Sequence, residues 1–377
     1  MTLAGSAKLA ARQTTVRRAL ETLKLEALVV TAPSNIRYLT NHGGSAGVLV
    51  VTGDAMHLLI DFRYREAVRM LQASPSACPS LRPWDVSGSY DEALLDCLGQ
   101  LGVSTAGFES PHLTVARHDW LVRTASARKL PLVFRSTGGI VETARMVKDD
   151  AEIDALREAA RRLTPVAQAA FSMVRPGVSE RAVAARIENA MRDAGYERTA
   201  FDTIVASGPN GALPHHRAGD RKFETGDLVV LDFGGVLDGY CSDLTRTVVV
   251  APPSAEAQRV FAAVREAQQA AIEAVRPGIA TTDVDRAARR VLETHGLGEA
   301  FGHGTGHGLG LDVHEEPRVT RPRADVAPVP LEPGMVFTIE PGAYLPGWGG
   351  VRIEDDVLVT EHGCDVLTSV SYALIPD

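Results

Sequence analysis

A repeat in the second part of the chain is the feature that most restricts how it can fold. The segment VRPGVSERAVAARIENAMRDAGY, which starts at Val174, has a counterpart in VRPGIATTDVDRAARRVLETHGL, which starts at Val275. Each copy contains a turn, a helical pattern and a glycine, the residue that commonly ends a helix in the left-handed conformation. Such self-similarity is typical of one structural unit built twice. The sequence therefore predicts a domain of two similar halves related by an approximate twofold axis.

Four acidic residues occupy equivalent positions in these halves. The run ETGDLVVLDFG aligns with LEPGMVFTIEPG, so that Asp232 corresponds to Glu340. A returning strand follows in each half, GYCSD and GVRIE, and aligns Asp243 with Glu354. A twofold axis between the halves would bring all four carboxylates to one centre.

Metal binding is the simplest explanation for these acids. Asp232 follows the apolar run LVVL and Glu340 follows VFTI, so both are expected on buried strands. An isolated carboxylate is costly to bury unless it is paired, protonated or bound to metal. Four carboxylates with an imidazole suit two divalent ions, Mn²⁺, Co²⁺, Zn²⁺ or Fe²⁺, bridged by two of the acids. Such a pair binds a bridging water, lowers its pKa and polarises a carbonyl, so the predicted chemistry is metal-assisted hydrolysis.

The run GHGTGHGLGLDVHEEP, residues 302–317, is expected to supply the imidazole. It places His303, His307 and His314 among glycines, which leave room for a bound group and permit positive φ. One of these histidines would be the nitrogen ligand, and the others would hold the substrate and its tetrahedral intermediate.

The first part of the chain has a different pattern. A helical pattern from Ala7 to Leu25 precedes three short apolar runs typical of strands, ALVVT, AGVLVVT and MHLLI. The stretch KDDAEIDALREAARR, from Lys148, begins with acidic residues suited to a helix N-terminus. A chain of 377 residues is expected to form about two domains. We predict a smaller α/β domain over residues 1–143 and a second domain over residues 144–377.

The charge balance argues against nucleic acid and membranes as partners. The chain has 39 Lys+Arg against 47 Asp+Glu, a net charge of −8, and no long basic run. No segment approaches the roughly 20 apolar residues that span a bilayer, and the start MTLAGSAKLAARQ lacks the apolar core of a signal peptide. Four cysteines without C-x-x-C spacing fit a reducing compartment. We therefore expect a cytoplasmic protein.

Several motifs together resemble one known family. GYCSDLTRT, GHGTGHGLGLDVHEEP, TIEPGAY and GGVRIEDD are similar to motifs of the proline-specific metallopeptidases, the Xaa-Pro aminopeptidases and Xaa-Pro dipeptidases (prolidases). NIRYLTN and IDFRYREA resemble that family's N-terminal domain, so the resemblance spans essentially the whole chain. It implies an α+β protein in which a small creatinase-like α/β domain precedes a pita-bread catalytic domain with a pseudo-twofold repeat.

The resemblance also implies a ligand set, carried over position by position. Asp232 would bind one metal, while Asp243 and Glu354 would bridge both. His307 and Glu340 would complete the second. The metal most expected from this resemblance is Mn²⁺, with Co²⁺ or Zn²⁺ as possible substitutes.

Further residues are implied to act on the substrate, a short proline-containing peptide. His215 would lie near the substrate, and His303 and His314 would line the site and stabilise the intermediate. Arg352 would support the bridging glutamate and the proline end. Glu340 would accept the proton when a metal-bridging hydroxide attacks. The resemblance further implies a homodimer or homotetramer.

Two branches of the family remain open on these residues. The sequence slightly favours an Xaa-Pro aminopeptidase over a prolidase, because no residue is identifiable as a clamp for a free proline carboxylate. Methionine aminopeptidases keep the ligands but usually lack the N-terminal domain and the VHEEP run. Creatinase departs at the ligand positions, and a non-catalytic binding module of this fold would have lost ligands, whereas this chain keeps them all.

Four further residues in or beside these motifs are not assigned to the site. His216 fits a solvated neighbour or a functional group, and Tyr344 fits a core position or a substrate contact. Asp355 should point away from Glu354, because successive strand residues face opposite sides. Neither it nor Asp356 is assigned as a ligand.

Overall fold

The computed structural model describes residues 3–324 and 327–375. It divides into two compact units, Leu3–Arg145 and a larger unit that starts at Met146. The division lies close to the boundary between residues 143 and 144 that the sequence suggests. Among the helices of the described residues, none combines the length and apolar character that a membrane span requires.

The smaller unit is a six-stranded mixed sheet with helices in its connections. The strand order is β4-β3-β2-β1-β5-β6. Strand β2 pairs antiparallel with β1 and β3, whereas the β3–β4, β1–β5 and β5–β6 pairs are parallel. Parallel neighbours need crossover connections, which α3 and α5 provide here. The strands are β1 Ala27–Val30, β2 Val48–Thr52, β3 Met56–Asp61, β4 Leu81–Val86, β5 Thr105–Glu109 and β6 Val133–Thr137. The helices are α1 Ser6–Leu23, α2 Pro33–Thr40, α3 Phe62–Gln72, α4 Tyr90–Gln100, α5 Val115–Ala127 and α6 Ile140–Met146.

The larger unit consists of two halves that repeat the order helix, helix, antiparallel strands, as the internal repeat predicts. In the first half, β10, β9 and β7 form a sheet in which β8 also pairs with β9. Its elements are α7 Asp150–Phe171, α8 Glu180–Asp193, β7 Arg198–Thr199, β8 Ile204–Ser207, η1 Gly208–Ala212, β9 Leu228–Leu237 and β10 Tyr240–Val249.

The second half has a five-stranded sheet, in the order β12-β11-β13-β16-β17, and a two-stranded sheet, β14-β15. Its helices are α9 Ala255–Ala274, α10 Thr281–Thr294 and the short η2 Gly298–Ala300. Its strands are β11 Gly306–Gly308, β12 Glu315–Val319, β13 Val336–Ile339, β14 Gly342–Leu345, β15 Gly349–Arg352, β16 Asp355–Val359 and β17 Cys364–Val366.

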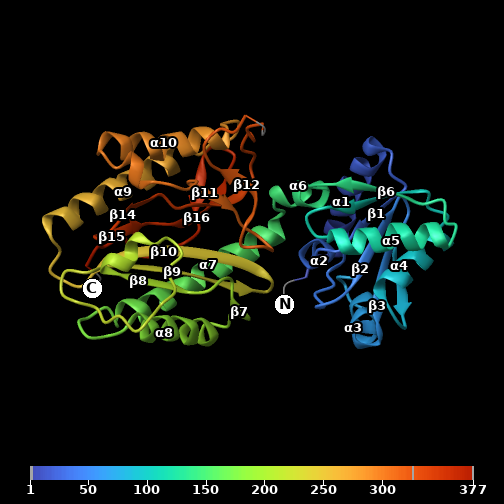
Figure 1. Ribbon diagram of the computed structural model, residues 1–377, viewed down its shortest axis with the longest axis horizontal. Coiled ribbons are helices and arrows are strands. Elements are labelled where there is room, and N and C mark those ends of the chain that lie inside the picture. The colour runs from blue at the N-terminus through green and yellow to red at the C-terminus, as the bar shows by residue number, and fades with distance from the viewer. Residues whose placement is uncertain (1–2, 325–326, 376–377) are drawn as a thin grey trace. The chain divides into compact units, whose positions relative to one another are not determined.

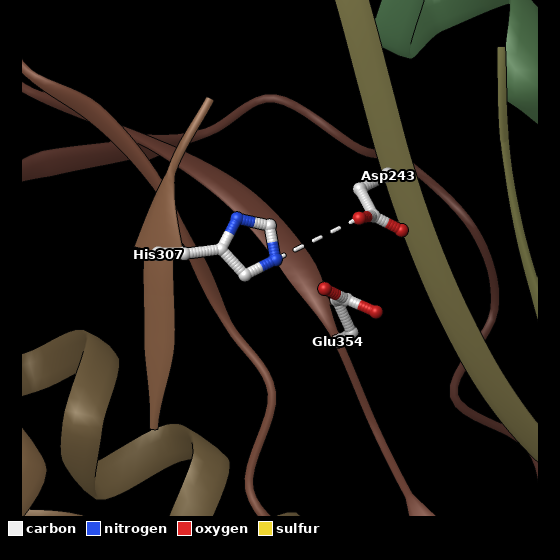
Figure 2. A group of neighbouring side chains, drawn as sticks. All are labelled: Asp243, His307 and Glu354. Atoms are coloured by element: carbon white, nitrogen blue, oxygen red, sulfur yellow. Dashed lines mark ion pairs between the residues drawn. The ribbon is translucent and has the colours of Figure 1, made fainter. Parts of the chain in front are cut away.

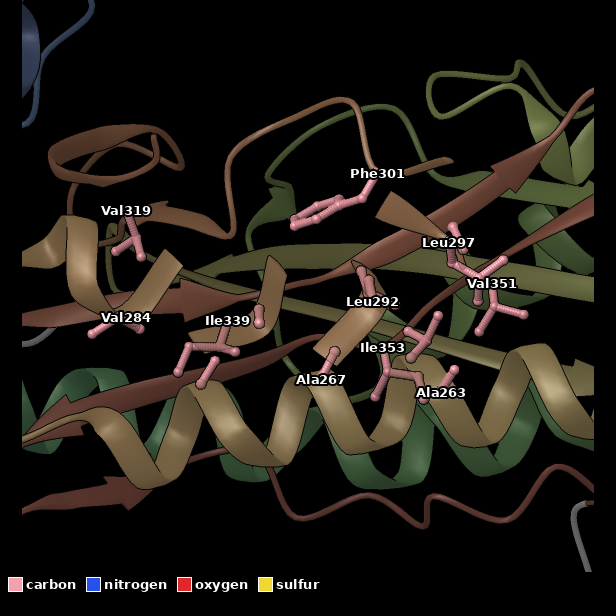
Figure 3. Close-up of a cluster of buried hydrophobic side chains, with 14 of the residues drawn as sticks. Ala263, Ala267, Val284, Leu292, Leu297, Phe301, Val319, Ile339, Val351 and Ile353 are labelled. Atoms are coloured by element: carbon pink, nitrogen blue, oxygen red, sulfur yellow. The ribbon is translucent and has the colours of Figure 1, made fainter. Parts of the chain in front are cut away.

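The strands of the two halves lie between the two helix pairs. Figure 1 shows α9 and α10 on one side of the strands of this unit and α7 and α8 on the other. Each pair covers its own apolar core. In the second half, Ala263 and Ala267 of α9 pack beside Val351 and Ile353 (Figure 3). Because alanine has a small side chain, α9 can approach the strands closely.

The hairpin of β9 and β10 sets the register for the first half. Its turn residues, Asp238 and Gly239, both have positive φ, 51° and 80°. A two-residue turn of this kind matches the twist of the flanking strands, and Asp-Gly is a preferred sequence for it. The resulting pairing places Thr245 opposite Asp232.

Candidate active site

One cavity of the larger unit, of about 1350 Å³, contains every site residue predicted from the sequence. The predicted residues that line it are Asp232, Asp243, His307, Glu340, Glu354, His215, His303, His314 and Arg352. They come from both halves of the repeat and from segments more than a hundred residues apart. Their roles as ligands and catalytic groups remain predictions, but their meeting in one cavity is a property of the structure.

The carboxylates meet because the sheets of the two halves touch along β10. Thr245 of β10 faces Asp232 of β9 on one side and forms an isolated antiparallel bridge with Glu354 on the other. The Glu354 amide donates to the Thr245 carbonyl oxygen at 3.0 Å. Asp243 lies two residues earlier on β10 and therefore faces the same side. One strand thus aligns acids from both halves.

An imidazole from β11 completes the centre. Figure 2 shows His307 pointing toward Asp243 and Glu354, which approach it from different strands. One ligand atom from each of these three residues lies within 4.8 Å of the others. The Nε2 atom of His307 is 3.9 Å from Asp243 Oδ2 and 3.4 Å from Glu340 Oε1.

The protonation states match those of metal ligands. Burial lowers the pKa of His307 to about 3, so the ring is neutral at neutral pH. Its Nδ1 lies 3.1 Å from the Gly308 carbonyl oxygen, which can only accept, so Nδ1 carries the proton. The lone pair of Nε2 consequently points at the carboxylates and is available to a cation or a proton between them. Metal-bound histidines commonly donate their other ring N–H to a backbone carbonyl oxygen in this way.

Burial and mutual repulsion raise the pKa values of three carboxyl groups at this centre. Burial and the neighbouring Glu354 and Asp232 raise the pKa of Asp243 well above its usual value. Burial, Glu340 and Asp232 do the same for Glu354. Burial raises the pKa of Glu340 to about 8. Like charges this close cannot all ionise unless cations neutralise them.

Two buried oxygen atoms at the centre have no hydrogen-bond partner. They are Asp232 Oδ1 and Asp243 Oδ1, and among the described residues no donor reaches either. Buried polar atoms are nearly always satisfied in folded proteins, so each exception calls for an explanation. A divalent cation held by these oxygens, by His307 and by the two glutamates would satisfy them. The residues present therefore fit a metal centre of oxygen ligands and one imidazole.

Hydroxyl groups orient the two glutamates. Thr245 Oγ1 donates to Glu354 Oε2 at 2.6 Å, and Thr338 Oγ1 lies 3.3 Å from Glu340 Oε1. Thr338 Oγ1 also accepts from the His307 amide at 3.1 Å. Both threonines are fully buried, so these contacts hold the carboxylates in fixed orientations. Neither threonine was singled out from the sequence, although one lies in the motif GYCSDLTRT and the other in TIEPGAY.

A directed chain of hydrogen bonds forms the wall beside the acids. Arg352 Nη1 donates to Tyr344 Oη at 2.8 Å, and Tyr344 Oη lies 2.8 Å from His303 Nε2. His303 Nδ1 lies 2.8 Å from the Gly304 carbonyl oxygen, so Nδ1 carries the proton and Nε2 accepts from Tyr344. Burial lowers the pKa of His303 to about 4 and keeps it neutral. Tyr344, which the sequence left open, is therefore part of the polar wall of the cavity.

The remaining two histidines also line the cavity. The ring of His314 packs edge-on against His307, with centroids 4.2 Å apart. Burial, and then the charge of Arg318, lower the pKa of His314. His215 follows Pro214, whose carbonyl oxygen lies 3.5 Å from Arg352 Nη2.

Arg352 contacts Asp232 directly and is linked to Glu354 through Thr245, whose hydroxyl accepts from Arg352 Nε at 3.2 Å and donates to Glu354. Arg352 donates from Nη2 to Asp232 Oδ2 at 2.5 Å rather than to Glu354. It acts on Glu354 through its charge, which lowers the pKa of that carboxyl against the stronger effect of burial.

The acids next to Glu354 take separate positions, as strand geometry requires. Asp355 faces away from the cavity and pairs with Arg246 at 2.7 Å, in agreement with the sequence-based expectation. Asp356 returns to the first side, where Oδ2 accepts from the Asp243 amide at 3.2 Å. Asp356 therefore stabilises β10 at Asp243, one of the predicted metal ligands.

The glycines around His307 have a packing role that the sequence did not reveal. A Cβ atom on Gly306 would overlap the Thr338 carbonyl oxygen, and one on Gly308 would overlap that of Glu316. Backbone atoms cannot move aside, so these positions exclude any side chain. Gly302, by contrast, lines the cavity with open space around it. The expectation that the glycines make room for a bound group thus applies to Gly302 but not to Gly308.

Arg318 on β12 is a cavity residue that the sequence analysis missed. It lines the same cavity as His307, His314 and Glu340, and its charge adds to the effect of burial on the pKa of the two histidines and opposes that effect at Glu340. Its acidic neighbour Glu316 is 4.0 Å away, and both side chains are about half exposed, 49% and 50%. The cation is therefore open to the cavity. A single arginine after VHEEP carries no signal of this by itself.

Comparison with known proteins agrees with this arrangement. Residues 154–361 match metallopeptidase family M24, and residues 12–147 match the creatinase/prolidase N-terminal domain. An Xaa-Pro dipeptidase of Pyrococcus horikoshii is 35% identical over 93% of this chain and 95% of its own length. The structure of an Xaa-Pro dipeptidase from Bacillus anthracis is 37% identical and has a TM-score of 0.89, covering 97% of this chain and 99% of that one. The X-Pro aminopeptidase from Thermotoga maritima is 34% identical with a TM-score of 0.81, covering 94% and 99%. The chain therefore belongs to metallopeptidase family M24 and carries that family's catalytic domain behind a creatinase/prolidase N-terminal domain.

Proposed function

We propose that the protein is a metal-dependent Xaa-Pro dipeptidase, which hydrolyses the bond between an N-terminal residue and a C-terminal proline. Relatives named Xaa-Pro dipeptidase match it over nearly the full length of both chains, which supports this function over the aminopeptidase function that the sequence slightly favoured. The structural observation that carries the proposal is the position of Arg318. Its half-exposed guanidinium lines the same cavity as the acidic cluster.

A dipeptidase needs to recognise a free proline carboxylate, and Arg318 can do so. An arginine fork binds a carboxylate through two parallel hydrogen bonds. A longer peptide has an amide at this point and gains no ion pair. Proline itself lacks an amide N–H and has a fixed φ, so a dedicated cavity can select it where a backbone-reading peptidase cannot.

The proposed cofactor is a pair of divalent ions. Asp232, Asp243, His307, Glu340 and Glu354 would hold them. The donor set contains carboxylates and one imidazole but no thiolate, which supports Mn²⁺, with Co²⁺ or Zn²⁺ as substitutes. When bound, such ions supply Lewis acidity and lower the pKa of water.

Protein groups around the centre handle the proton and the substrate. Glu340, held by Thr338, is the proposed acceptor of the proton from the attacking water and its donor to the proline nitrogen, because its carboxylate lines the cavity 3.4 Å from His307 Nε2. His314 and His215 face the cavity and are the proposed hydrogen-bond partners of the scissile carbonyl and its tetrahedral intermediate. Both nitrogens of His303 are already engaged, so we assign it to orienting the substrate beside Tyr344.

Side-by-side hydrolysis of Ala-Pro and Ala-Pro-Ala tests the function. The protein is stripped with a chelator and resupplied with Mn²⁺, Co²⁺ or Zn²⁺. We expect metal-restored cleavage, with kcat/KM for the dipeptide at least about tenfold above that for the tripeptide, the discrimination of one good ion pair. The reverse preference would establish the second candidate, an Xaa-Pro aminopeptidase, which the likeness to the Thermotoga maritima enzyme supports. No metal-restored cleavage of either peptide contradicts both.

We also propose a homodimer or homotetramer, on the strength of the family resemblance. Light scattering on the purified protein tests it, and a monomer at micromolar concentration would contradict it.

A further inference from the structure

Glu180, a buried acid outside the acidic cluster, is the first residue of α8. The side chain of Glu180 has no exposed surface. Its Oε1 accepts from the Ser207 amide at 2.9 Å, from Ser207 Oγ at 2.7 Å and from Asn210 Nδ2 at 2.9 Å. All three donors belong to the end of β8 and the 3₁₀ turn η1 that follows it.

The other oxygen of Glu180 binds the far end of the same segment. Oε2 accepts from the Gly219 amide at 3.1 Å and lies 2.8 Å from His216 Nε2. Because an ionised carboxylate can only accept, this Nε2 carries the proton. One side chain therefore ties together the start, middle and end of residues 207–219.

This segment forms one wall of the cavity. Pro214, His215, His216, Arg217 and Ala218 all line it. After η1 the segment has no regular secondary structure until the single bridge at Lys222, so no sheet or helix hydrogen bonds set its path. The bonds to Glu180 take over that role.

Helix capping does not explain this acid. Ser179 is already the N-cap of α8, and its hydroxyl accepts from the Ala182 amide. Burial alone would raise the pKa of Glu180, but hydrogen bonds from Asn210, Ser207 and His216 outweigh it and lower the pKa below its usual value. The group therefore stays ionised and accepts five hydrogen bonds, more than a local helix start requires. Charge-assisted bonds of this type are about twice as strong as neutral ones.

The second half anchors its own histidine segment from the equivalent helix, with different residues. On α10, Asp285 Oδ1 accepts from the amide and hydroxyl of Thr305 at 3.1 and 2.9 Å. Arg289, paired with Asp285, donates to the carbonyl oxygens of Phe301 and His303. Each half thus holds a histidine-bearing segment of the cavity through a buried acid on its second helix.

We propose that Glu180 is a positioning residue of the active site, which holds residues 207–219 so that His215 meets the substrate. Glu180 touches neither the cavity nor the acidic cluster and acts through His215. The activity readout of this proposal rests on the dipeptidase function proposed above. The amide hydrogen exchange of residues 207–219 is a second readout, and it does not depend on that function.

The first test is Glu180→Gln in the full-length, metal-loaded protein. Glutamine keeps the size of the side chain but replaces one acceptor by an NH₂ donor, which faces either Gly219 N–H and His216 or Ser207. We expect amide hydrogen exchange in residues 207–219 to speed up at least about tenfold, while the rest of α8 and the metal content stay unchanged. Exchange that remains as slow as in the wild type overturns the proposal, whatever the substrate of the enzyme proves to be.

The second test is a double-mutant cycle on Ala-Pro hydrolysis. Glu180→Gln should reduce kcat/KM about 10- to 100-fold, the usual cost of losing support behind a reacting group. In the His215→Ala background the same change should cost less than about threefold, and in the His303→Ala background it should keep its full cost. An equal loss in both backgrounds overturns the proposal, because Glu180 would then act on the fold as a whole.

Two further variants serve as controls. Asp193→Asn changes an exposed acid at the end of the same helix and should leave amide exchange and kcat/KM unaltered.

Ser207→Ala removes one of the five hydrogen bonds to Glu180 and replaces Glu180→Gln as the test variant if Glu180→Gln does not fold. Its effect on kcat/KM should also shrink in the His215→Ala background, although the effect itself is smaller than that of Glu180→Gln. An effect that shrinks in the His303→Ala background instead would count against the proposal. If the wild-type protein cleaves no Xaa-Pro peptide, the proposed function fails while the exchange measurement still decides the role of Glu180.

Discussion

Arg352 donates a hydrogen bond from Nη2 to Asp232 Oδ2, and the two side chains are only 4% and 11% exposed. The pair joins β15 of the second half to β9 of the first. Its guanidinium is in direct contact with the acidic cluster formed by Asp232, Asp243, Glu340 and Glu354. Burial, followed by repulsion from neighbouring carboxylates, nevertheless raises the pKa values of Asp243, Glu340 and Glu354.

Replacing Asp243 or Glu354, two of the proposed metal ligands, should remove the metal and the activity together. In Asp243→Ala or Glu354→Ala the centre loses an oxygen ligand, and we expect the tightly bound metal content to fall by at least half and kcat/KM by a factor of about 10³ or more. Elemental analysis after gel filtration measures the first quantity. Glu361→Ala, at an exposed acid, is the control. Full metal content and turnover in either ligand variant would show that the centre lies elsewhere.

Metal binding should release protons at neutral pH. Glu340 has a pKa of about 8 in the metal-free protein, and those of Asp243 and Glu354 are also raised, so protons occupy this cluster at pH 7. A cation displaces them, because ligands bind in deprotonated form. Calorimetric titration with Mn²⁺ in buffers of different ionisation enthalpy should show about one proton or more released per chain. Binding without proton release would contradict these protonation states.

The metal-free protein should lose stability as pH rises. Carboxyls whose pKa is higher in the folded than in the unfolded chain stabilise the fold while protonated, and the contribution is lost as pH rises through the folded value, about 8 for Glu340. Between about pH 5 and pH 8 we expect Tm of the stripped protein to drop by roughly 5–10 °C. Scanning calorimetry on the metal-loaded protein should show a much smaller change, since the ions neutralise the acids. Equal pH profiles for the two forms would be inconsistent with an acid cluster that the metal compensates.

Arg352→Lys should preserve the charge but not the geometry. A lysine cannot reach Asp232 and Tyr344 with two separate nitrogens, as the guanidinium does. We expect kcat/KM for Ala-Pro to fall about 10- to 100-fold while the bound metal remains. Steady-state kinetics with parallel metal analysis checks this outcome. Wild-type kinetics would show that the arginine contributes charge alone.

Arg318 should decide the preference for dipeptides. Arg318→Gln removes the proposed partner of the proline carboxylate, so kcat/KM for Ala-Pro should fall about tenfold or more while that for Ala-Pro-Ala changes less than about threefold. Arg321→Gln, three residues away and exposed, should affect neither peptide. If both peptides lose activity equally in Arg318→Gln, the residue serves another purpose.

The fold and the candidate site were predictable from sequence to different extents. The repeat and the motifs around Asp232, Asp243, His307 and Glu354 are local patterns, and a local pattern specifies strand, turn and ligand type by itself. The pita-bread class and the family therefore followed from the sequence, and so did the set of residues that the structure brings into one cavity. The same patterns did not decide between an Xaa-Pro dipeptidase and an Xaa-Pro aminopeptidase. The proposal of a dipeptidase therefore also draws on the similar proteins of that name.

Only the tertiary structure decided which side chains support that set. The bridge between Thr245 and Glu354, the bond from Arg352 to Asp232 and the approach of Gly306 to Thr338 each join segments at least thirty residues apart. No periodicity records such contacts, because they arise where two sheets meet. The anchoring of residues 207–219 by Glu180 is of the same kind, since five donors spread along a segment without regular structure converge on a single carboxylate only after the chain has folded. The sequence by itself thus determined the set of predicted ligands, and the packing of the two halves determined their charge states, their orientation and the walls of the cavity around them.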